Sequence, residues 1–401
     1  MQAARASELA PREPVLSVQA RPSVVHDPDP TPAIMLAFAD RTGLTGRRPD
    51  RRYLWTDAFA VCNYLGLARA TGEPQYSELA LKLVDRVHHT LGRHRPDDPR
   101  TGWISGLDAE QGEAHPTRGG LRIGKDLPER LATEPVDARL EWDRDGQYFH
   151  YLTRWMHALD QTARATGQPF FNVWGRELAE AAHRAFVYPV GGGHRRMHWK
   201  MSIDLSRPLV RSMGQHDPLD GYVTCLQLSA TVPARPVLDA VTADFASMVD
   251  LAGLETTDPL GLGGLMMDAC RLDQLARQGA PVEPRLRDEM LEAALGGLER
   301  YARQGELDEG AEHRLAFREL GLATGLHAVA LMRQQGTGDP VLERLGAYDP
   351  LRAEILAFWL RAEHQRASSW TGHRDINEVM LATALAPDGL LALRAMTHPQ
   401  P

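Results

Sequence analysis

Acidic, aromatic and basic side chains crowd residues 141–151, immediately before a pattern typical of a helix from Leu152 to Thr166. The first N–H groups of a helix have no partner inside the helix and carry partial positive charge, so a helix start can face a ligand. We therefore expect this segment to border an active site, where its carboxylates and imidazole could transfer protons. It reads Glu141, Trp142, Asp143, Arg144, Asp145, Gly146, Gln147, Tyr148, Phe149, His150 and Tyr151.

Similar side chains stand at the starts of other apolar helical patterns. Aspartate often precedes a helix only to cap its first N–H groups, and Asp57, Asp217 and Asp375 are each good candidates for such caps. If one architecture brings the helix starts together, the same residues line a common site. The candidates are Trp55 and Asp57; His216, Asp217, Asp220 and Tyr222; His313 and Arg318; and Trp370, His373, Arg374, Asp375 and Glu378.

Two turns have nearly the same sequence, which indicates a structural repeat. Residues 68–74 read A-R-A-T-G-E-P, and residues 163–169 read A-R-A-T-G-Q-P. Glycine ends one helix in the left-handed conformation and proline opens the next, so each turn joins two helices into a hairpin. Looser pairs follow, giving about five second members and six first members, which start near Asp57, Gly146, Asp220, Gly261, His313 and Asp375.

The two sets of helices differ in pattern and in the loops before them. The second members are the more amphipathic, as in an outer ring with one wet face, and the first members are apolar nearly all round. Long connections precede the first members, whereas short turns follow them. We therefore predict that residues 33–401 form one all-α domain, an (α/α)6 toroid of six hairpins with long loops at the inner-helix N-termini. The Pro-rich residues 1–32 are expected to be an extended or disordered arm.

In these features the chain resembles the six-hairpin, or (α/α)6 toroid, superfamily of glycosidases, unsaturated uronyl hydrolases, polysaccharide lyases and N-acylglucosamine 2-epimerase-like enzymes. The resemblance rests on the T-G-[EQ]-P turn with a following E-L-A, at residues 71–80 and 166–179, and covers about residues 51–393. It implies a ligand site in the funnel at the inner-helix N-termini. It matches no single member family closely enough to carry over catalytic residues.

Hydrolysis of a glycosidic bond is the first chemistry that the candidate residues indicate. It needs one protonated and one ionised carboxyl, about 6.5–9.5 Å apart for inversion of the sugar and about 5–5.5 Å apart for retention. Asp143 or Asp145 from one inner-helix start, opposite Asp217, Asp220 or Asp375 from another, would supply such a pair across the funnel.

Aromatic residues favour a sugar as the ligand. Four of the eight tryptophans, Trp55, Trp142, Trp199 and Trp370, lie on the side of the long loops or at inner-helix starts. Aromatic faces stack on the C–H faces of sugars, although burial in loop packing explains any single indole equally well. The residues expected to bind the small-molecule or oligosaccharide substrate are Trp55, Asp57, Trp142, Tyr148, His150, Trp199, His313, Arg318, Trp370 and Arg374.

Two alternatives remain open. A sugar epimerase, isomerase or lyase would use histidine or tyrosine to move a proton at carbon, and an arginine to hold a carbonyl or acidic oxygen. His216, His373, His313 and His150 would serve that chemistry, together with Arg318, Arg374 and Tyr148. The third possibility is a toroid without catalytic activity that binds a glycan or a peptide.

Composition argues against several other classes. The net charge is -8 and no basic stripe stands out, so we expect no nucleic-acid partner. No apolar run approaches the ~18 residues of a membrane span, and no signal peptide is evident, so a cytoplasmic protein is expected. Cys62, Cys225 and Cys270 are interpreted as small core residues. His194, His198, His216 with Asp217, and His373 with Asp375 lack a compact metal-ligand spacing, so we expect no metal and no cofactor.

Overall fold

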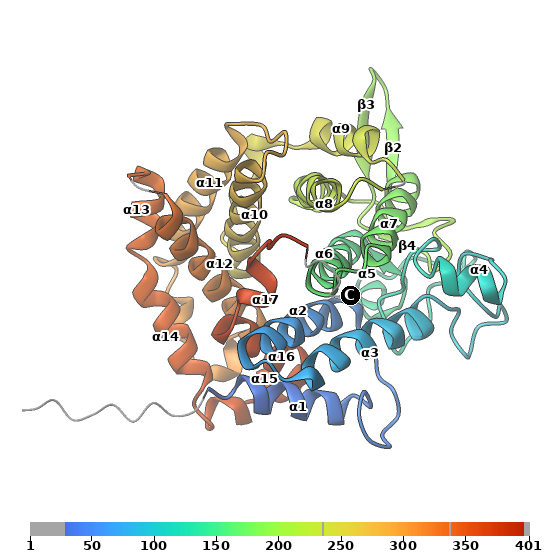
Figure 1. Cartoon of the computed structure of the whole chain (residues 1–401), viewed down its shortest axis with the longest axis horizontal. Coiled ribbons are helices and arrows are strands. Elements are labelled where there is room, and N and C mark those ends of the chain that lie inside the picture. Colours follow the sequence, from blue (N-terminus) through green and yellow to red (C-terminus); the bar gives the residue numbers. More distant parts are fainter. Residues whose placement is uncertain (1–28, 235, 337, 397–401) are drawn as a thin grey trace, which may run out of the picture.

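The computed structural model describes residues 29–234, 236–336 and 338–396 of the chain. Residues 1–28 of the expected arm lie outside this described part, and its last residues already belong to a helix, α1 (Thr31–Arg41). Helices dominate the described residues and form an inner and an outer ring (Figure 1). The predicted all-α (α/α)6 toroid is therefore confirmed.

Six helices form the inner ring, and each packs against the next until the last closes on the first. They begin within three residues of the predicted starts. Because an inner helix has neighbours on all sides, it is buried nearly all round, and every residue of α2 from Leu54 to Leu67 is buried. In chain order the ring consists of α2 (Leu54–Thr71), α6 (Phe149–Thr166), α8 (Asp217–Thr231), α10 (Pro259–Arg277), α12 (Ala316–Gln335) and α16 (Arg374–Leu385).

Each inner helix has an outer partner that buries only one face. In α3, for example, Tyr76, Leu79, Leu83 and Val87 are buried and recur every three or four residues. α1 packs against α16 and is the sixth outer element, which the sequence pattern did not reveal among the prolines before and at its start. The other outer helices are α3 (Pro74–Leu91), α7 (Phe170–Phe186), α9 (Asp239–Met248), α11 (Leu286–Tyr301) and the pair α13 (Pro340–Gly346) and α14 (Asp349–Trp359).

The repeated A-R-A-T-G turn has the geometry that its sequence predicts. Gly72 and Gly167 follow α2 and α6 with φ of +72° and +70°, a conformation that glycine adopts without steric cost. Pro74 then begins α3, and Pro169 directly precedes α7. These short turns gather at one end of the toroid and leave the other end to the long connections.

The long connections carry the strands and the short helices. α4 (Ala109–Ala114) and α5 (Ala138–Asp143) precede β1 (Gln147–Tyr148), which pairs antiparallel with β4 (Lys200–Met201). β5 (Pro208–Val210) completes that sheet, and β2 (Val187–Val190) with β3 (His194–Met197) forms a hairpin that projects from the ring (Figure 1). The remaining short helices are Leu251–Gly253, Glu306–Asp308, Ala311–His313, His364–Arg366 and α15 (Ser368–Thr371).

The C-terminal segment closes the end of the ring opposite the long connections. α17 (Asp388–Leu391) packs against α2, α6 and α10 and lies inside the ring in Figure 1. Side chains of the inner helices donate to backbone carbonyls of this segment: Gln161 to Gly389 at 2.8 Å and Gln274 to Leu391 at 2.8 Å. Among the described residues, this segment therefore covers the end of the ring interior that lies opposite the long connections.

The sequence also led to expectations about the cysteines and about membrane-spanning helices. Cys62, Cys225 and Cys270 are all buried, as predicted for small core residues. In the described ranges of the chain, none of the helices combines the length and the apolar character needed to cross a membrane.

Candidate functional site

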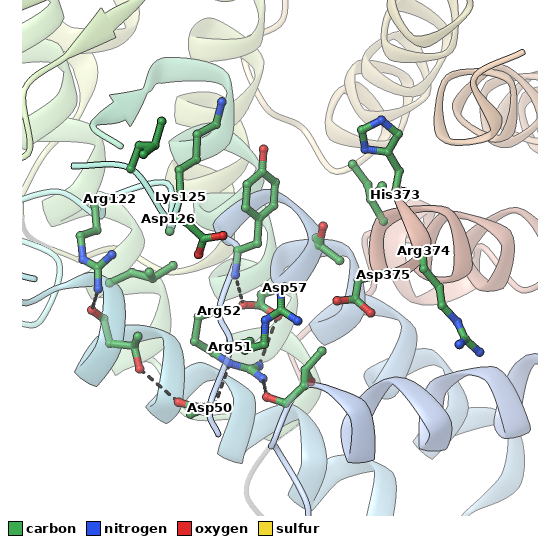
Figure 2. Close-up of a pocket in the computed structure, with 18 of the residues that line it drawn as sticks. Asp50, Arg51, Arg52, Asp57, Arg122, Lys125, Asp126, His373, Arg374 and Asp375 are labelled. Carbon is green, nitrogen blue, oxygen red and sulfur yellow. Dashed lines mark hydrogen bonds and ion pairs between the residues drawn. The ribbon is translucent and has the colours of Figure 1, made fainter. Parts of the chain in front are cut away.

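A cavity of about 840 Å³ opens beside the N-terminal ends of α2 and α16. The long connection before α6 forms its other side, so the cavity lies at the end of the toroid where the sequence predicts a site. In Figure 2, Lys125 and Asp126 stand on one side, His373 and Asp375 stand on the other, and Asp57 lies between them.

Most charged groups around the cavity have ion-pair partners, several of which lie outside the cavity lining. Arg52 contacts Asp57 at 3.3 Å and Asp50 at 3.0 Å, and Asp375 accepts a 2.6 Å hydrogen bond from Arg41. Burial raises the pKa of Asp57 to about 6, although the charge of Arg52 opposes this shift. Because cations and carboxylates nearly balance, the cavity suits a neutral polar ligand better than a strongly charged one.

Asp143 and Asp145 are only two residues apart but have different environments. Asp143 is exposed at the cavity and, like Asp126, forms no ion pair with another described residue. Asp145 is fully buried and accepts hydrogen bonds from Arg122 at 3.0 Å and from the backbone N–H of Gly124 at 3.0 Å. The Asp145 carboxylate therefore anchors the long connection, whereas Asp143 is free to meet a ligand.

A buried lysine holds α5 against the toroid. Lys200, on β4, is fully buried and donates to the backbone carbonyls of Glu141 at 2.5 Å and Arg144 at 2.8 Å. Burial lowers the pKa of Lys200 to about 8, and the charge of Glu141 partly opposes this shift. This anchor fixes Trp142, which is half exposed, together with the adjacent Asp143.

Aromatic side chains connect the cavity with the interior of the ring. Tyr53 lines the cavity, and its hydroxyl lies 2.7 Å from that of Tyr151. The Tyr151 ring packs edge-on against His150, with centroids 4.9 Å apart. Trp199 donates from Nε1 to Nδ1 of His150 at 3.1 Å, so a neutral His150 carries its proton on Nε2. Trp199 also packs edge-on against Trp142, which completes a continuous aromatic path.

Beyond this path lies the throat, as we name the part of the ring interior lined by His150, Arg154, Asp217, Asp220 and Asp268. Arg154 of α6 approaches Asp220 of α8 at 3.3 Å and Asp268 of α10 at 3.9 Å. Because α6 and α10 are not neighbours in the ring, the second contact crosses its interior. The side chains of His150 and Arg154 are 31% and 17% exposed, so solvent reaches the throat.

The opposite wall of the throat is aromatic. Trp55 of α2 and Phe317 of α12 have ring centroids 6.5 Å apart. Since α16 lies between α2 and α12 in the ring, this contact also lies in the interior. His373, which is exposed at the cavity, packs edge-on against Phe317 with centroids 6.1 Å apart. The throat thus combines an ionic wall with an apolar wall, as the hydroxyl groups and C–H faces of a sugar require.

Two carboxylate oxygens of the ionic wall lack hydrogen-bond partners among the described residues. Oδ2 of Asp217 and Oδ1 of Asp220 are buried and accept no hydrogen bond there. The contacts of Arg154 are long for hydrogen bonds. Burial, and to a smaller extent the negative charge of Asp220, raises the pKa of Asp217 to about 7. Burial lowers the pKa of His150 to about 3, with a further contribution from Arg154, so this imidazole is neutral.

In the next layer of the interior, which we call the floor, each polar side chain has a hydrogen-bond partner. The floor consists of His157, Gln227 and Arg271 with the carbonyl of Leu390. Arg271 donates to Asp268 at 2.8 Å and to Oε1 of Gln227 at 2.7 Å. His157 lies 2.9 Å from the same Oε1 and 3.0 Å from the Leu390 carbonyl. The throat therefore ends at a layer in which each of these side chains has a hydrogen-bond partner.

Comparisons with known proteins identify the architecture. The solved structures that match include a sugar epimerase from a ruminal bacterium (11% identity, 88% of this chain and 98% of that chain, TM-score 0.50), a GH76 alpha-mannanase of Bacteroides thetaiotaomicron (10%, 90% and 97%, 0.52) and a D-mannose isomerase (12%, 88% and 95%, 0.52). The chain has the six-hairpin toroid fold. No family model matches the sequence, and no curated protein does. The expected resemblance is therefore confirmed for the fold.

The toroid brings most of the predicted site residues to one end. His150, Asp217 and Asp220 meet in the throat, and Trp55 belongs to its apolar wall. Tyr148 is buried beneath the aromatic path, with its ring centroid 5.4 Å from that of His150. The cavity is lined by Asp57, Asp143, His373, Arg374 and Asp375, and Trp142 and Trp199 stand on the aromatic path.

Four predicted residues lie apart from the cavity and the throat. His216 immediately precedes α8, where its Nε2 lies 2.8 Å from a backbone carbonyl. His313 is exposed on a short helix, and Arg318 is exposed and bound to an aspartate at 2.6 Å. Trp370 is buried and stacks on another tryptophan, with centroids 5.7 Å apart, so it belongs to the core.

Sequence reasoning missed Arg154 and Asp268 because it considered helix starts, and these residues lie in the bodies of inner helices. The sequence nevertheless contains a pattern that could have indicated these residues. A charged residue inside a helix that is apolar on all sides has to find a partner in the interior of the protein. Arg154, Asp268 and Arg271 are such residues, and together they mark the position of the throat.

The candidate metal ligands do not gather. His194 lies on β3, and His198 stacks on Tyr188 with centroids 4.3 Å apart. Within the described part of the chain, no group of three or more His, Cys, Asp or Glu side chains is arranged to hold a metal ion.

Proposed function

We propose that this protein is a carbohydrate-active enzyme that moves a proton at a carbon of a neutral free sugar, as a sugar isomerase or epimerase does. The observation that carries the proposal is Asp217, a buried carboxyl with a pKa raised to about 7, one oxygen of which, Oδ2, has no hydrogen-bond partner among the described residues. A group whose pKa lies near the working pH both takes and returns a proton effectively.

The residues of the throat have definite roles in this reaction. Ionised Asp217 removes the proton from the carbon next to the carbonyl of an open-chain sugar, and the electron pair of that C–H bond forms an enediolate. Arg154 stabilises the negative oxygen. Return of the proton to the neighbouring carbon, with transfer of the hydroxyl proton from one oxygen of the enediolate to the other, gives isomerisation. Return to the original carbon from its other face gives epimerisation. Epimerisation would use His373, from the opposite side, as the second proton carrier.

The positive charge of Arg154 favours this reaction over glycosidic hydrolysis in the throat. Hydrolysis passes through a positively charged, oxocarbenium-like state, which Arg154 would destabilise. It also requires two carboxyls on opposite sides of the sugar, whereas Asp217 and Asp220 lie about one turn apart on the same helix. The wall that faces them presents Trp55 and Phe317. Two of the structures with this fold are described as a sugar epimerase and a D-mannose isomerase, in agreement with the proposal.

Hydrolysis remains the second candidate because of the outer cavity. Asp126 and Asp143 are exposed there without ion-pair partners among the described residues. At about 840 Å³ the cavity lies in the upper part of the ~300–1,000 Å³ range of small-molecule sites and has room for more than one sugar ring. One neighbour with this fold is described as an alpha-mannanase.

A paired activity screen separates the two candidates. Free neutral aldoses and ketoses are tested for interconversion, and chromogenic glycosides are tested for release of the chromophore. The proposal predicts interconversion that falls by about 10²–10⁴-fold in Asp217→Asn and persists in Asp143→Asn. Chromophore release that is lost in Asp143→Asn, without any interconversion, would replace the proposal with hydrolysis.

A further inference from the structure

Gly264 stands on α10 one turn nearer the mouth of the throat than Asp268. A Cβ atom added at Gly264 would meet no atom within 4 Å. Residues 265–273 of the same helix are buried, whereas Gly264 is partly exposed. Because Asp268 contacts Arg154 across the ring interior, and positions four apart share a helix face, Gly264 also faces that interior.

At the neighbouring position, Gly263, helix packing does require glycine. A Cβ atom at Gly263 would lie 2.2 Å from the carbonyl oxygen of Gly321, so close packing of α10 on α12 demands glycine there. No such contact exists at Gly264 among the described residues. Glycine inside a helix destabilises the helix relative to alanine. Packing therefore gives no reason for glycine at position 264.

A second observation indicates that the space holds a ligand. Oδ2 of Asp217 and Oδ1 of Asp220 belong to side chains that are 8% and 5% exposed, and neither atom has a hydrogen-bond partner among the described residues. Asp220 follows Asp217 by about one turn on α8, just as Asp268 follows Gly264 by one turn on α10. By this spacing, we expect the open space beside Gly264 at the level of Asp217, one turn nearer the mouth than the contact between Asp268 and Arg154.

We propose that Gly264 sets the width of the throat and admits a hexose, the carbon skeleton of which occupies the space beside the Gly264 Cα. This inference rests on the proposed function and names its substrate class. A methyl group at position 264 takes the room that a hexose needs for its additional CH2OH group and leaves room for a pentose. A larger side chain closes the throat to both.

Kinetics with matched sugars test the proposal. D-mannose is compared with D-lyxose, and D-glucose with D-xylose, since each pair differs by one CH2OH group. Gly264→Ala is expected to raise KM for the hexoses by roughly 10-fold or more and to leave KM for the pentoses within about 3-fold. Its Tm should rise by about 1–2 °C, because alanine favours the helix. The control is Gly191→Ala, at another glycine with open space, where KM should not change.

A labelling experiment gives a readout that does not depend on turnover. The native cysteines are buried and burial raises the pKa of each to about 12, so the unsubstituted protein provides a background that reacts little with N-ethylmaleimide. Gly264→Cys should react readily, and D-mannose or D-glucose should slow its labelling. Absence of labelling would overturn the proposal, because the space would then be closed.

The outcomes distinguish this inference from the proposed function. If Gly264→Ala raises Tm but leaves KM unchanged for both hexoses, while Asp217→Asn abolishes interconversion, the role of Gly264 is refuted and the proposed function stands. If Gly264→Cys is labelled and no sugar slows the labelling, the space does not hold the sugar. If the unsubstituted protein interconverts no sugar, the proposed function fails, and sugar protection of Gly264→Cys would then mark the throat as a binding site alone.

Discussion

The throat and the floor are adjacent layers of the same ring interior, and they differ in how their polar groups are satisfied. In the floor, Arg271, Gln227 and His157 bond to one another and to the C-terminal segment. In the throat, Asp217 and Asp220 each keep one buried oxygen without a hydrogen-bond partner among the described residues. A buried polar atom without a partner costs about 1–3 kcal/mol, so the throat lowers stability where the floor supports it. The difference indicates that the throat is shaped for a ligand and the floor for the fold.

The largest expected effect is a loss of unfolding free energy when the hydrogen bonds of the floor are removed. Arg271→Leu should destabilise the protein by about 3–5 kcal/mol, because the substitution leaves Asp268 and Oε1 of Gln227 buried without their main donor. Chemical denaturation measures the change. The control is Arg277→Leu on the same helix, where the guanidinium is 47% exposed and the effect should stay below about 1 kcal/mol. Equal effects in the two variants would contradict the role of Arg271 in holding the floor together.

The next effect concerns Asp217 and depends on pH. Its pKa is raised from 3.8 to about 7 in the folded protein, so the folded state binds the proton more tightly than the unfolded state. The contribution of Asp217 to stability is therefore fully present below about pH 4 and is lost as pH rises to 7. Asp217→Asn removes this dependence, and its unfolding free energy relative to the unsubstituted protein should rise by at most about 3 kcal/mol between pH 5 and pH 8.

The corresponding control is Asp143→Asn. Asp143 is exposed at the cavity, so its substitution should change stability by less than about 0.5 kcal/mol at either pH. Urea unfolding of the three proteins at pH 5 and pH 8 gives the comparison. A difference between Asp217→Asn and the unsubstituted protein that stays constant with pH would show that Asp217 is an ordinary ionised carboxylate, and the throat would lose its candidate acid and base.

A smaller effect is expected at the C-terminal segment below the floor. Gln278 donates a 2.7 Å hydrogen bond to the carbonyl of Leu393. Gln278→Leu should cost about 0.5–1.5 kcal/mol in unfolding free energy, the usual value for a single neutral hydrogen bond, and should leave sugar turnover unchanged. Loss of turnover with unchanged stability would mean that the C-terminal end of the ring also takes part in the reaction.

The sequence predicted the fold well because the fold repeats. The two A-R-A-T-G turns predict helical hairpins. The contrast between apolar first helices and amphipathic second helices predicts which helices form the inner ring and which form the outer ring. Helix α1 was missed as an outer element because prolines flank its start. The end of the toroid that carries the cavity followed from the long connections.

The individual site residues were harder to predict, because burial depends on contacts that are distant in sequence. Asp143 and Asp145 are equivalent in the local pattern, yet Arg122, from a different part of the long connection, buries Asp145 and leaves Asp143 exposed. Similarly, Trp142 remains half exposed whereas Trp370 is in the core. Arg154 joins the throat through contacts with α8 and α10 that no local pattern of α6 reveals.

Solvent deuterium exchange tests the central claim most directly. The protein is incubated in D2O with D-mannose, D-glucose and D-fructose, and NMR follows the C–H signals next to the carbonyl carbon. Deuterium should enter the sugar with the unsubstituted protein and with Asp143→Asn, and the rate should fall by about 10²–10⁴-fold with Asp217→Asn. Incorporation at the full rate with Asp217→Asn, or no incorporation with the unsubstituted protein, would contradict the assignment of Asp217 as the group that moves the proton.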